Sequence, residues 1–265
     1  MRGAQTGQPG RTGRSERPEQ PGRTGQPGRT GQPGRMERSG RPGQTARPMQ
    51  VAEPVLPQQL EDAVPLEQVL SLAQAFERPV REYRFAGGSA AGMPLEKTEY
   101  KACVFKDCRF TGASLANAWF QNVVFENCDF SGAGVIEATL QKVRFVRCKL
   151  TGANFTEAVL TDVSLEDCIA QNAVFSETTL KNVLFLRGDY SGAAFWDVRR
   201  RSVFRLQQCR LEQAEFLHTS LNGQDLTGCD IEGASFSGEG ELRGAKVTAL
   251  QACELAKLLG VIIEG

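Results

Sequence analysis

A large apolar residue stands at every fifth position between Phe105 and Phe195, and this period constrains the fold more than any other feature of the chain. A period of five fits neither the 3.6-residue repeat of an α-helix nor the two-residue alternation of a plain strand. The series is Phe105, Phe110, Leu115, Phe120, Phe125, Phe130, Val135, Leu140, Phe145, Leu150, Phe155, Leu160, Leu165, the small exception Ala170, then Phe175, Leu180, Phe185, Tyr190 and Phe195.

The residues between these large ones complete the repeat. Two positions before each large residue stands a small one, such as Cys103, Ala113 or Val123. A spacing of two puts both side chains on one face of a short strand, so the remaining residues must turn a corner. The corner position is often Gly, Asn or Asp, which tolerate positive φ most easily. Examples are Gly112, Asn122, Asn127, Gly132, Gly152, Asp162, Asp167, Asn172, Asn182 and Gly192.

A second period, of twenty residues, sets the number of sides. The small residue is Val at positions 123, 143, 163, 183 and 203, Cys at 108, 128, 148 and 168, and Ala at 113, 133, 153, 173 and 193. Four sides of five residues therefore make one turn of a coil. Like residues would then stack in columns, about 4.8 Å apart, which is the spacing of neighbouring strands.

These repeats resemble the pentapeptide-repeat family. The resemblance rests on the run Ala153-Asn154-Phe155-Thr156, on corners of the type Ser131-Gly132-Ala133, and on the twenty-residue columns. It implies an all-β fold, a right-handed quadrilateral parallel β-helix over residues 83–247, and in many members a homodimer. Residues 51–82 would then form an N-terminal cap or linker over an end whose backbone is otherwise unpaired.

The first fifty residues have a different composition. They hold ten Arg against three acids, repeat the motif Pro-Gly-Arg-Thr-Gly, and contain almost no large apolar side chains. Such a Pro/Gly/Arg low-complexity segment cannot bury enough surface to order itself, so we expect a disordered tail. The tail could contact nucleic acid through its charge. Alternatively it is dispensable upstream sequence, with Met36 or Met49 as the true start.

The repeat loses its frame twice near its C-terminal end. One extra residue is expected as a bulge within Trp196–Ser202, and a second slip within Ser237–Gly240. The repeat then ends on Leu242 and Val247. Residues 248–265 are expected to form a short capping helix, with Thr248 as N-cap and Gly260 as its end, followed by an apolar tail.

Composition and motifs favour neither an enzyme nor a cofactor-binding or metal-binding protein. The single histidine, His218, has no Ser, Cys or carboxylate placed by the columns to form a triad, and no phosphate-binding loop is present. Cysteines at the small inward position are expected to behave as small hydrophobic residues in the reduced state. No apolar run reaches the ~18 residues of a membrane span, and nothing resembles a signal peptide, so we expect a cytoplasmic protein.

The sequence therefore predicts a binding or scaffold protein with an unassigned protein partner. Trp196, Arg199, Arg200 and Arg201 are the candidate interaction residues, because the bulge gathers them. The resemblance to fluoroquinolone-resistance members implies an alternative, in which an acidic rod imitates DNA towards DNA gyrase and topoisomerase IV. A second alternative is nucleic-acid contact through the Arg-rich tail and Arg199–Arg201.

Charge gives the DNA-mimic alternative little support. Residues 81–265 hold 20 Lys and Arg against 23 Asp and Glu. One column of outward residues also alternates in sign, so its members are expected to pair across coils and to cancel a uniform field. This column contains Arg109, Asp129, Lys149, Ile169, Asp189, Arg210 and Asp230.

The C-terminal end is predicted to mediate a homodimer. One short helix is too narrow to cover all four sides of the last coil, and β-branched residues after Gly260 suit a pairing strand. Two tails meeting about a two-fold axis would bury both ends. The alternative is a tail that folds back on its own helix. The candidate interface residues are Leu255, Leu258, Leu259, Val261, Ile262 and Ile263.

Overall fold

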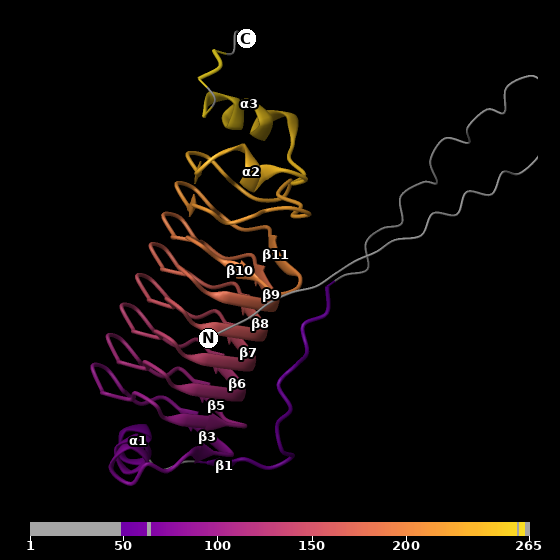
Figure 1. Ribbon diagram of the computed structural model, residues 1–265. Helices are drawn as coiled ribbons and strands as arrows, with labels where there is room; N and C mark the ends of the chain where they lie inside the picture. Colours follow the sequence, from indigo (N-terminus) through magenta and orange to yellow (C-terminus); the bar gives the residue numbers. More distant parts are fainter. Residues whose placement is uncertain (1–48, 63–64, 259, 263–265) are drawn as a thin grey trace, which may run out of the picture. The chain divides into compact units, whose positions relative to one another are not determined.

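The computed structural model describes residues 49–62, 65–258 and 260–262 (Figure 1). The tail of residues 1–48 lies outside the described residues, as do two candidate interface residues, Leu259 and Ile263. Among the helices of the described part, none has the length and hydrophobicity needed to cross a membrane.

Parallel strands dominate the structure. They are β1 (Glu61–Asp62), β2 (Val80–Arg81), β3 (Tyr83–Ala86), β4 (Glu99–Lys101), β5 (Val104–Lys106), β6 (Trp119–Glu126), β7 (Thr139–Val146), β8 (Val159–Glu166), β9 (Thr179–Leu186), β10 (Arg199–Arg200), β11 (Phe204–Gln207), β12 (Glu215–Phe216) and β13 (Ser235–Phe236). The helices are α1 (Leu66–Ala75), α2 (Glu239–Leu242) and α3 (Ala249–Lys257).

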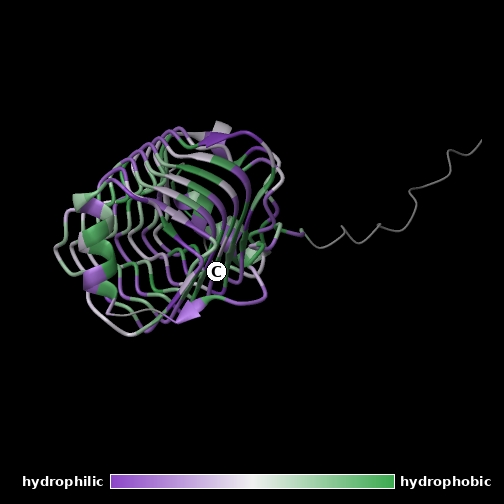
Figure 2. Cartoon of the chain, turned by 90° about the horizontal axis from the view of Figure 1, so that it is seen from below, coloured by the Kyte–Doolittle hydropathy of each residue, from purple (hydrophilic) through white to green (hydrophobic). Residues whose placement is uncertain are grey.

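Strand pairing confirms the twenty-residue turn. Phe105 faces Phe125, which faces Phe145 on β7, and every pair of strands is parallel. Single bridges continue the same register on the other two sides, for example between Ser114 and Gly134. The expected right-handed, four-sided parallel β-helix is therefore confirmed, and Figure 2 shows its coils superposed along the column.

The corners use the left-handed backbone region even where no glycine is present. Asn127, Glu157 and Asp162 have φ values of 53°, 60° and 53°. This conformation costs a non-glycine residue about 1–2 kcal/mol. Each corner N–H nevertheless donates to the next coil, as Asn127 N does to the Val146 carbonyl at 2.9 Å, so the stack offsets the cost by satisfying the backbone.

Columns of aromatic rings fill the interior. Phe85, Phe105, Phe125 and Phe145 stack with ring centroids 4.9–5.0 Å apart, and Phe155, Phe175 and Phe195 form a second stack at 5.0–5.1 Å. These distances match the spacing between strands, so one register serves both the backbone hydrogen bonds and the core.

The cysteine column is buried as expected. Cys108, Cys128, Cys148 and Cys168 are each no more than 2% exposed, and all are free thiols. The Cys128 thiol donates to the Phe105 carbonyl at 3.3 Å. Burial is also the main reason why the pKa of the nearby Cys103 thiol rises to about 11. These thiols are therefore packing groups of the core.

Two exceptions to the repeat compensate each other. Ala170 and Tyr190 occupy the same column one coil apart, where other coils carry Phe or Leu. Gly188 stands in the cysteine column because the ring of Tyr190 takes the space: a Cβ on Gly188 would lie 2.5 Å from Tyr190 Cε2. The large Tyr190 is therefore accommodated by small residues at both neighbouring positions.

The first coil begins at Val80, three residues before the expected start at Tyr83, because β2 pairs with β4. Helix α1 lies at this end and places Leu66, Leu70 and Ala73 in the core. Strand β1 adds one further strand beside β3. The open end of the β-helix is thus partly covered.

The first frame slip is confirmed, and the structure places the extra residue in a shorter segment than the sequence did. Arg200 pairs with Leu180, but Phe204 pairs with Val183, so the extra residue lies within 201–203. The expectation that Val203 continues the valine column is wrong, because Phe204 takes that position and Val203 is 43% exposed. The next coil supplies the buried Gln224, whose Nε2 donates to the Phe204 carbonyl at 2.7 Å.

The second slip and the C-terminal helix also lie where they were expected. Helix α2 covers the slip, after which Asp225 pairs with Lys246, a spacing of twenty-one. Thr248 is the N-cap of α3, since its Oγ1 accepts from Gln251 N at 3.1 Å and its own N–H donates to Gln251 Oε1 at 2.8 Å. The Gln251 Nε2 group also donates to the carbonyls of Leu226 and Cys229, which fixes α3 to the last coil.

Candidate interaction surface

Four acidic residues occupy successive coils at one corner of the β-helix. They are Glu137, Glu157, Glu177 and Asp197, all with positive φ of 52–60°. At about 4.8 Å for each coil, they form a ridge about 14 Å long. We call these four residues the acidic ridge. Glu137 and Glu157 have no ion pair within 4 Å among the described residues, whereas Arg199 contacts Glu177 at 3.2 Å and His218 contacts Asp197 at 3.4 Å.

The sides on both flanks of the ridge carry no charge beside Glu137 and Glu157, whereas on one flank Lys181 follows Glu177 and Arg199 follows Asp197. The neutral outward residues on one flank are Ser114, Gly134, Asn154, Val174, Ala194, Ala116, Ile136, Thr156 and Ser176, and those on the other are Trp119, Thr139, Val159, Thr179, Gln121, Gln141 and Thr161. Trp119 is 46% exposed and Val159 37%. Glu137 and Glu157 therefore stand between two neutral surfaces, one with an exposed aromatic ring.

The structure brings the sequence-predicted interaction residues together at one end of this ridge, around Asp197. Trp196 is 41% exposed, and its Nε1 donates to Glu215 Oε2 at 2.8 Å. Arg200 Nη1 donates to the Asn222 carbonyl at 2.6 Å, so this side chain holds the bulge to the next coil. With Arg199 paired to Glu177, Arg201 alone of the three has no side-chain hydrogen bond in the part of the chain described.

The column that alternates in sign stacks as expected but does not form the expected pairs. Asp129 is bridged to Arg109 and Lys149, yet no ion pair within 4 Å joins members of the column in the described structure. Burial opposes ionisation of Asp129, but hydrogen bonds from Ser131 and the charge of Lys149 outweigh it and lower the carboxyl pKa. The local Ser131 contact, at 2.6 Å, holds the carboxylate away from its neighbours.

Ion pairs between coils form at a neighbouring corner instead. Arg187 binds Asp167 through two contacts, at 2.7 and 2.9 Å, and Arg147 binds Glu126 at 2.6 Å. Because these charges neutralise each other, that corner presents no net field comparable to the acidic ridge.

Two family models match the chain. One, described as pentapeptide repeat region, matches residues 138–204, and the other, described as pentapeptide repeats (8 copies), matches residues 108–147 and 205–238. Together they cover residues 108–238 of the β-helix without a gap. The chain belongs to the pentapeptide-repeat family.

Solved structures are similar to this pentapeptide-repeat protein at low identity. Full-length QnrB1, a plasmid-mediated fluoroquinolone resistance protein, is 17% identical, with 69% of this chain and 91% of QnrB1 covered and a TM-score of 0.31. HetL from the cyanobacterium Nostoc, involved in regulation of heterocyst differentiation, is 17% identical, with 69% and 95% covered and a TM-score of 0.24. The search of curated proteins gave no match.

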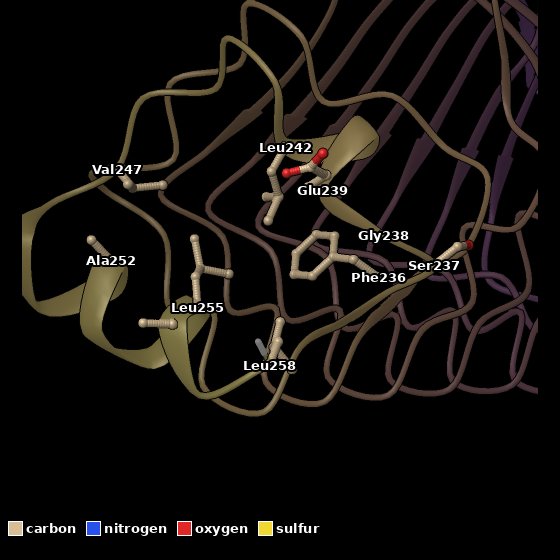
Figure 3. A pocket seen from close by; sticks show the side chains of 10 residues that line it. Phe236, Ser237, Gly238, Glu239, Leu242, Val247, Ala252, Leu255 and Leu258 are labelled. Carbon is tan, nitrogen blue, oxygen red and sulfur yellow. The ribbon is translucent and has the colours of Figure 1, made fainter. Parts of the chain in front are cut away.

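The C-terminal end of this pentapeptide-repeat protein is apolar and partly open. Figure 3 shows Leu255 of α3 pointing towards Phe236 and Leu242, which line an open cavity of about 360 Å³. The other described interface candidates are exposed: Leu258 by 52%, Val261 by 50% and Ile262 by 88%. Helix α3 thus leaves apolar surface beside the last coil.

The single histidine of the chain lies on the surface beside the acidic ridge. The imidazole Nδ1 of His218 lies 3.4 Å from the carboxylate of Asp197, and both side chains are more than half exposed. No cluster of three or more His, Cys, Asp or Glu side chains capable of holding a metal ion occurs within the described ranges.

Proposed function

We propose that this pentapeptide-repeat protein is a non-enzymatic binding protein that engages a protein partner through the acidic ridge. The observation that carries the proposal is the position of Glu137 and Glu157 between two uncharged sides, with no ion pair to either carboxylate among the described residues. A partner with a basic, elongated surface fits this arrangement. Free buried thiols agree with a reducing location such as the cytoplasm.

Screening by salt explains why the ridge attracts a basic partner more strongly than the other surface charges do. At physiological ionic strength the Debye length is about 8 Å, so charges on the far sides of the β-helix contribute little to the field at the ridge. Within that range the neutral flanks leave the carboxylates of Glu137 and Glu157 uncompensated. The exposed ring of Trp119 adds an aromatic anchor, a residue type enriched at binding hot spots.

Charge reversal tests the proposal. The double variant Glu137→Lys and Glu157→Lys should lose partner proteins that the wild-type chain captures by cross-linking from its host extract. Glu232→Lys is the matched control, since it reverses an exposed acid on a different side. We expect the control to retain the partners and added salt to weaken their capture. Equal capture by the double variant would refute a role for the ridge.

A second candidate function is supported by the same ridge, which presents a short row of negative charge as the DNA backbone does. In this case the partner would be DNA gyrase or topoisomerase IV, and the protein would protect them from quinolones. The same three chains can be compared in supercoiling assays with purified gyrase. Unchanged supercoiling and drug sensitivity at a tenfold protein excess would exclude this candidate.

We also propose a homodimer through the C-terminal end, supported by the exposure of Leu258, Val261 and Ile262 beside the open cavity. Burying these side chains against a second copy would remove apolar surface from water. Light scattering should therefore give the mass of a dimer at a protein concentration of ~10 μM, at which association with a micromolar dissociation constant is visible. Deletion of residues 261–265 together with Leu258→Asp should give a monomer. A dimer that survives these changes would place the interface elsewhere.

A further inference from the structure

Residues 49–60, which we call the strap, lie outside the coils and run along the side of the β-helix. In Figure 1 this is the indigo segment that descends beside the strands to β1. It contains no helix or strand. Three polar contacts attach it to the β-helix: Asn182 Nδ2 donates to the Gln50 carbonyl at 3.3 Å, Arg144 Nη1 contacts Glu53 Oε2 at 2.9 Å, and Val55 N donates to Asn122 Oδ1 at 3.0 Å.

The geometry of these contacts requires an extended peptide. Asn182 and Asn122 are three coils apart, a distance of about 14 Å at the spacing of neighbouring strands. The five steps along the chain from Gln50 to Val55 span about 16 Å when extended. The strap therefore crosses about one coil for every two residues, at right angles to the strands, and proline at positions 54 and 57 suits such an extended chain.

The surface beneath the strap has the features of a peptide-binding site. It consists of the corner residues Asn122, Lys142, Asp162 and Asn182 together with Arg144, and we call it the ledge. The corner side chains stand at four successive coils with φ of 53–58°, so their polar groups form a regular row. Asn182 Nδ2 also contacts Asp162 Oδ1, which fixes the orientation of its amide.

Arg144 gives the ledge its charge preference. Its side chain is about one-third exposed and also contacts Glu166 at 3.4 Å, so it is held in place when it meets Glu53. Its Nε is buried and has no acceptor among the described residues. The ledge thus offers a donor to a peptide carbonyl, a guanidinium to a carboxylate three residues later, and an acceptor to an N–H two residues beyond that.

The strap is held weakly. None of its residues is among the buried core residues, and Val55, whose N–H is bonded, is 64% exposed. Its three polar contacts are exposed, and such contacts contribute little to stability individually. Segments of this kind open locally without unfolding of the domain.

We propose that the ledge is a binding site for an extended acidic peptide segment of a partner protein, and that the strap occupies this site in the absence of the partner. The site is separate from the acidic ridge and does not depend on it. The required pattern is a carbonyl, a carboxylate three residues later, and a non-proline residue two positions after the carboxylate. Because the strap is tethered, it competes at an effective concentration of about 1 mM, which lowers the apparent affinity of a peptide with a Kd of about 100 μM about tenfold.

The experiment uses the full chain and a fluorescent peptide with the sequence of residues 47–58. In the Glu53→Lys chain, Arg144 repels the strap and the ledge is released. We expect this chain to bind the peptide about tenfold more tightly than the wild-type chain does. The matched control is Gln58→Lys, which adds the same charge to the strap at an exposed position without a polar contact, and it should bind as the wild-type chain does.

A charge exchange makes the test specific. The chain with Arg144→Glu should bind a peptide carrying Glu53→Lys better than the unchanged peptide, whereas the Glu53→Lys chain should prefer the unchanged peptide. This crossed preference cannot arise from misfolding, because one variant chain must bind one peptide and reject the other. Equal binding by the Glu53→Lys and Gln58→Lys chains, or absence of the crossed preference, would overturn the proposal.

Discussion

Replacing Gly188 with cysteine is expected to lower the free energy of unfolding by about 1–3 kcal/mol, although cysteine stands at this position in the four preceding coils. The new Cβ would lie 2.5 Å from Cε2 of Tyr190 and 3.0 Å from the Cys168 carbonyl oxygen. Neither neighbour can move freely, since Tyr190 is fully buried and packs edge-on against Phe185 at 5.3 Å. Urea unfolding at equilibrium measures the loss.

A second substitution should suppress this effect. In the chain with Tyr190→Leu the ring is absent, and the two substitutions together would reproduce the pair Cys148 and Leu150 of an earlier coil. We therefore expect Gly188→Cys to cost much less in that background, with a coupling of at least about 1 kcal/mol between the two positions. Additive losses would show that the ring of Tyr190 is not what requires glycine at position 188.

The regular part of the fold could be predicted because each coil repeats the same solution. Once the inward positions are assigned at Phe105 and Cys108, the same assignment holds for every repeat as far as Phe195. Since identical backbone contacts recur every twenty residues, a single periodicity defines both the hydrogen bonding and the core. The position of the extra residue near Arg201 followed from the same count.

The exceptions could not be predicted, because they depend on contacts between coils. The large ring of Tyr190 fits because Ala170 and Gly188 beside it are small. Phe204 fits because a bulge precedes it and because the amide of Gln224 donates a hydrogen bond to its carbonyl. Each of these residues looks ordinary within its own five-residue repeat. Their compensation becomes visible when the three-dimensional neighbours are known.

The two proposed interaction surfaces differ in how visible they are in the sequence. The acidic ridge obeys the twenty-residue period, so a search of every column would have found Glu137, Glu157 and Glu177, whereas attention to the alternating column did not. The strap has no period. Nothing in residues 49–60 indicates that they contact Arg144, more than eighty positions later, because that contact depends on the path of the chain around α1 and β1.

Deletion of one coil tests the central claim, that four sides of five residues make each turn of a continuous surface. Removing residues 142–161 joins Gln141 to Asp162, which occupy adjoining positions in neighbouring coils. Removing residues 142–163 instead takes out two further residues and moves each later large side chain to a position built for a small one. We expect cooperative thermal unfolding and a β-type circular dichroism spectrum for the first deletion, and loss of both for the second. A first deletion that fails to fold, or equal behaviour of the two, would contradict the claim.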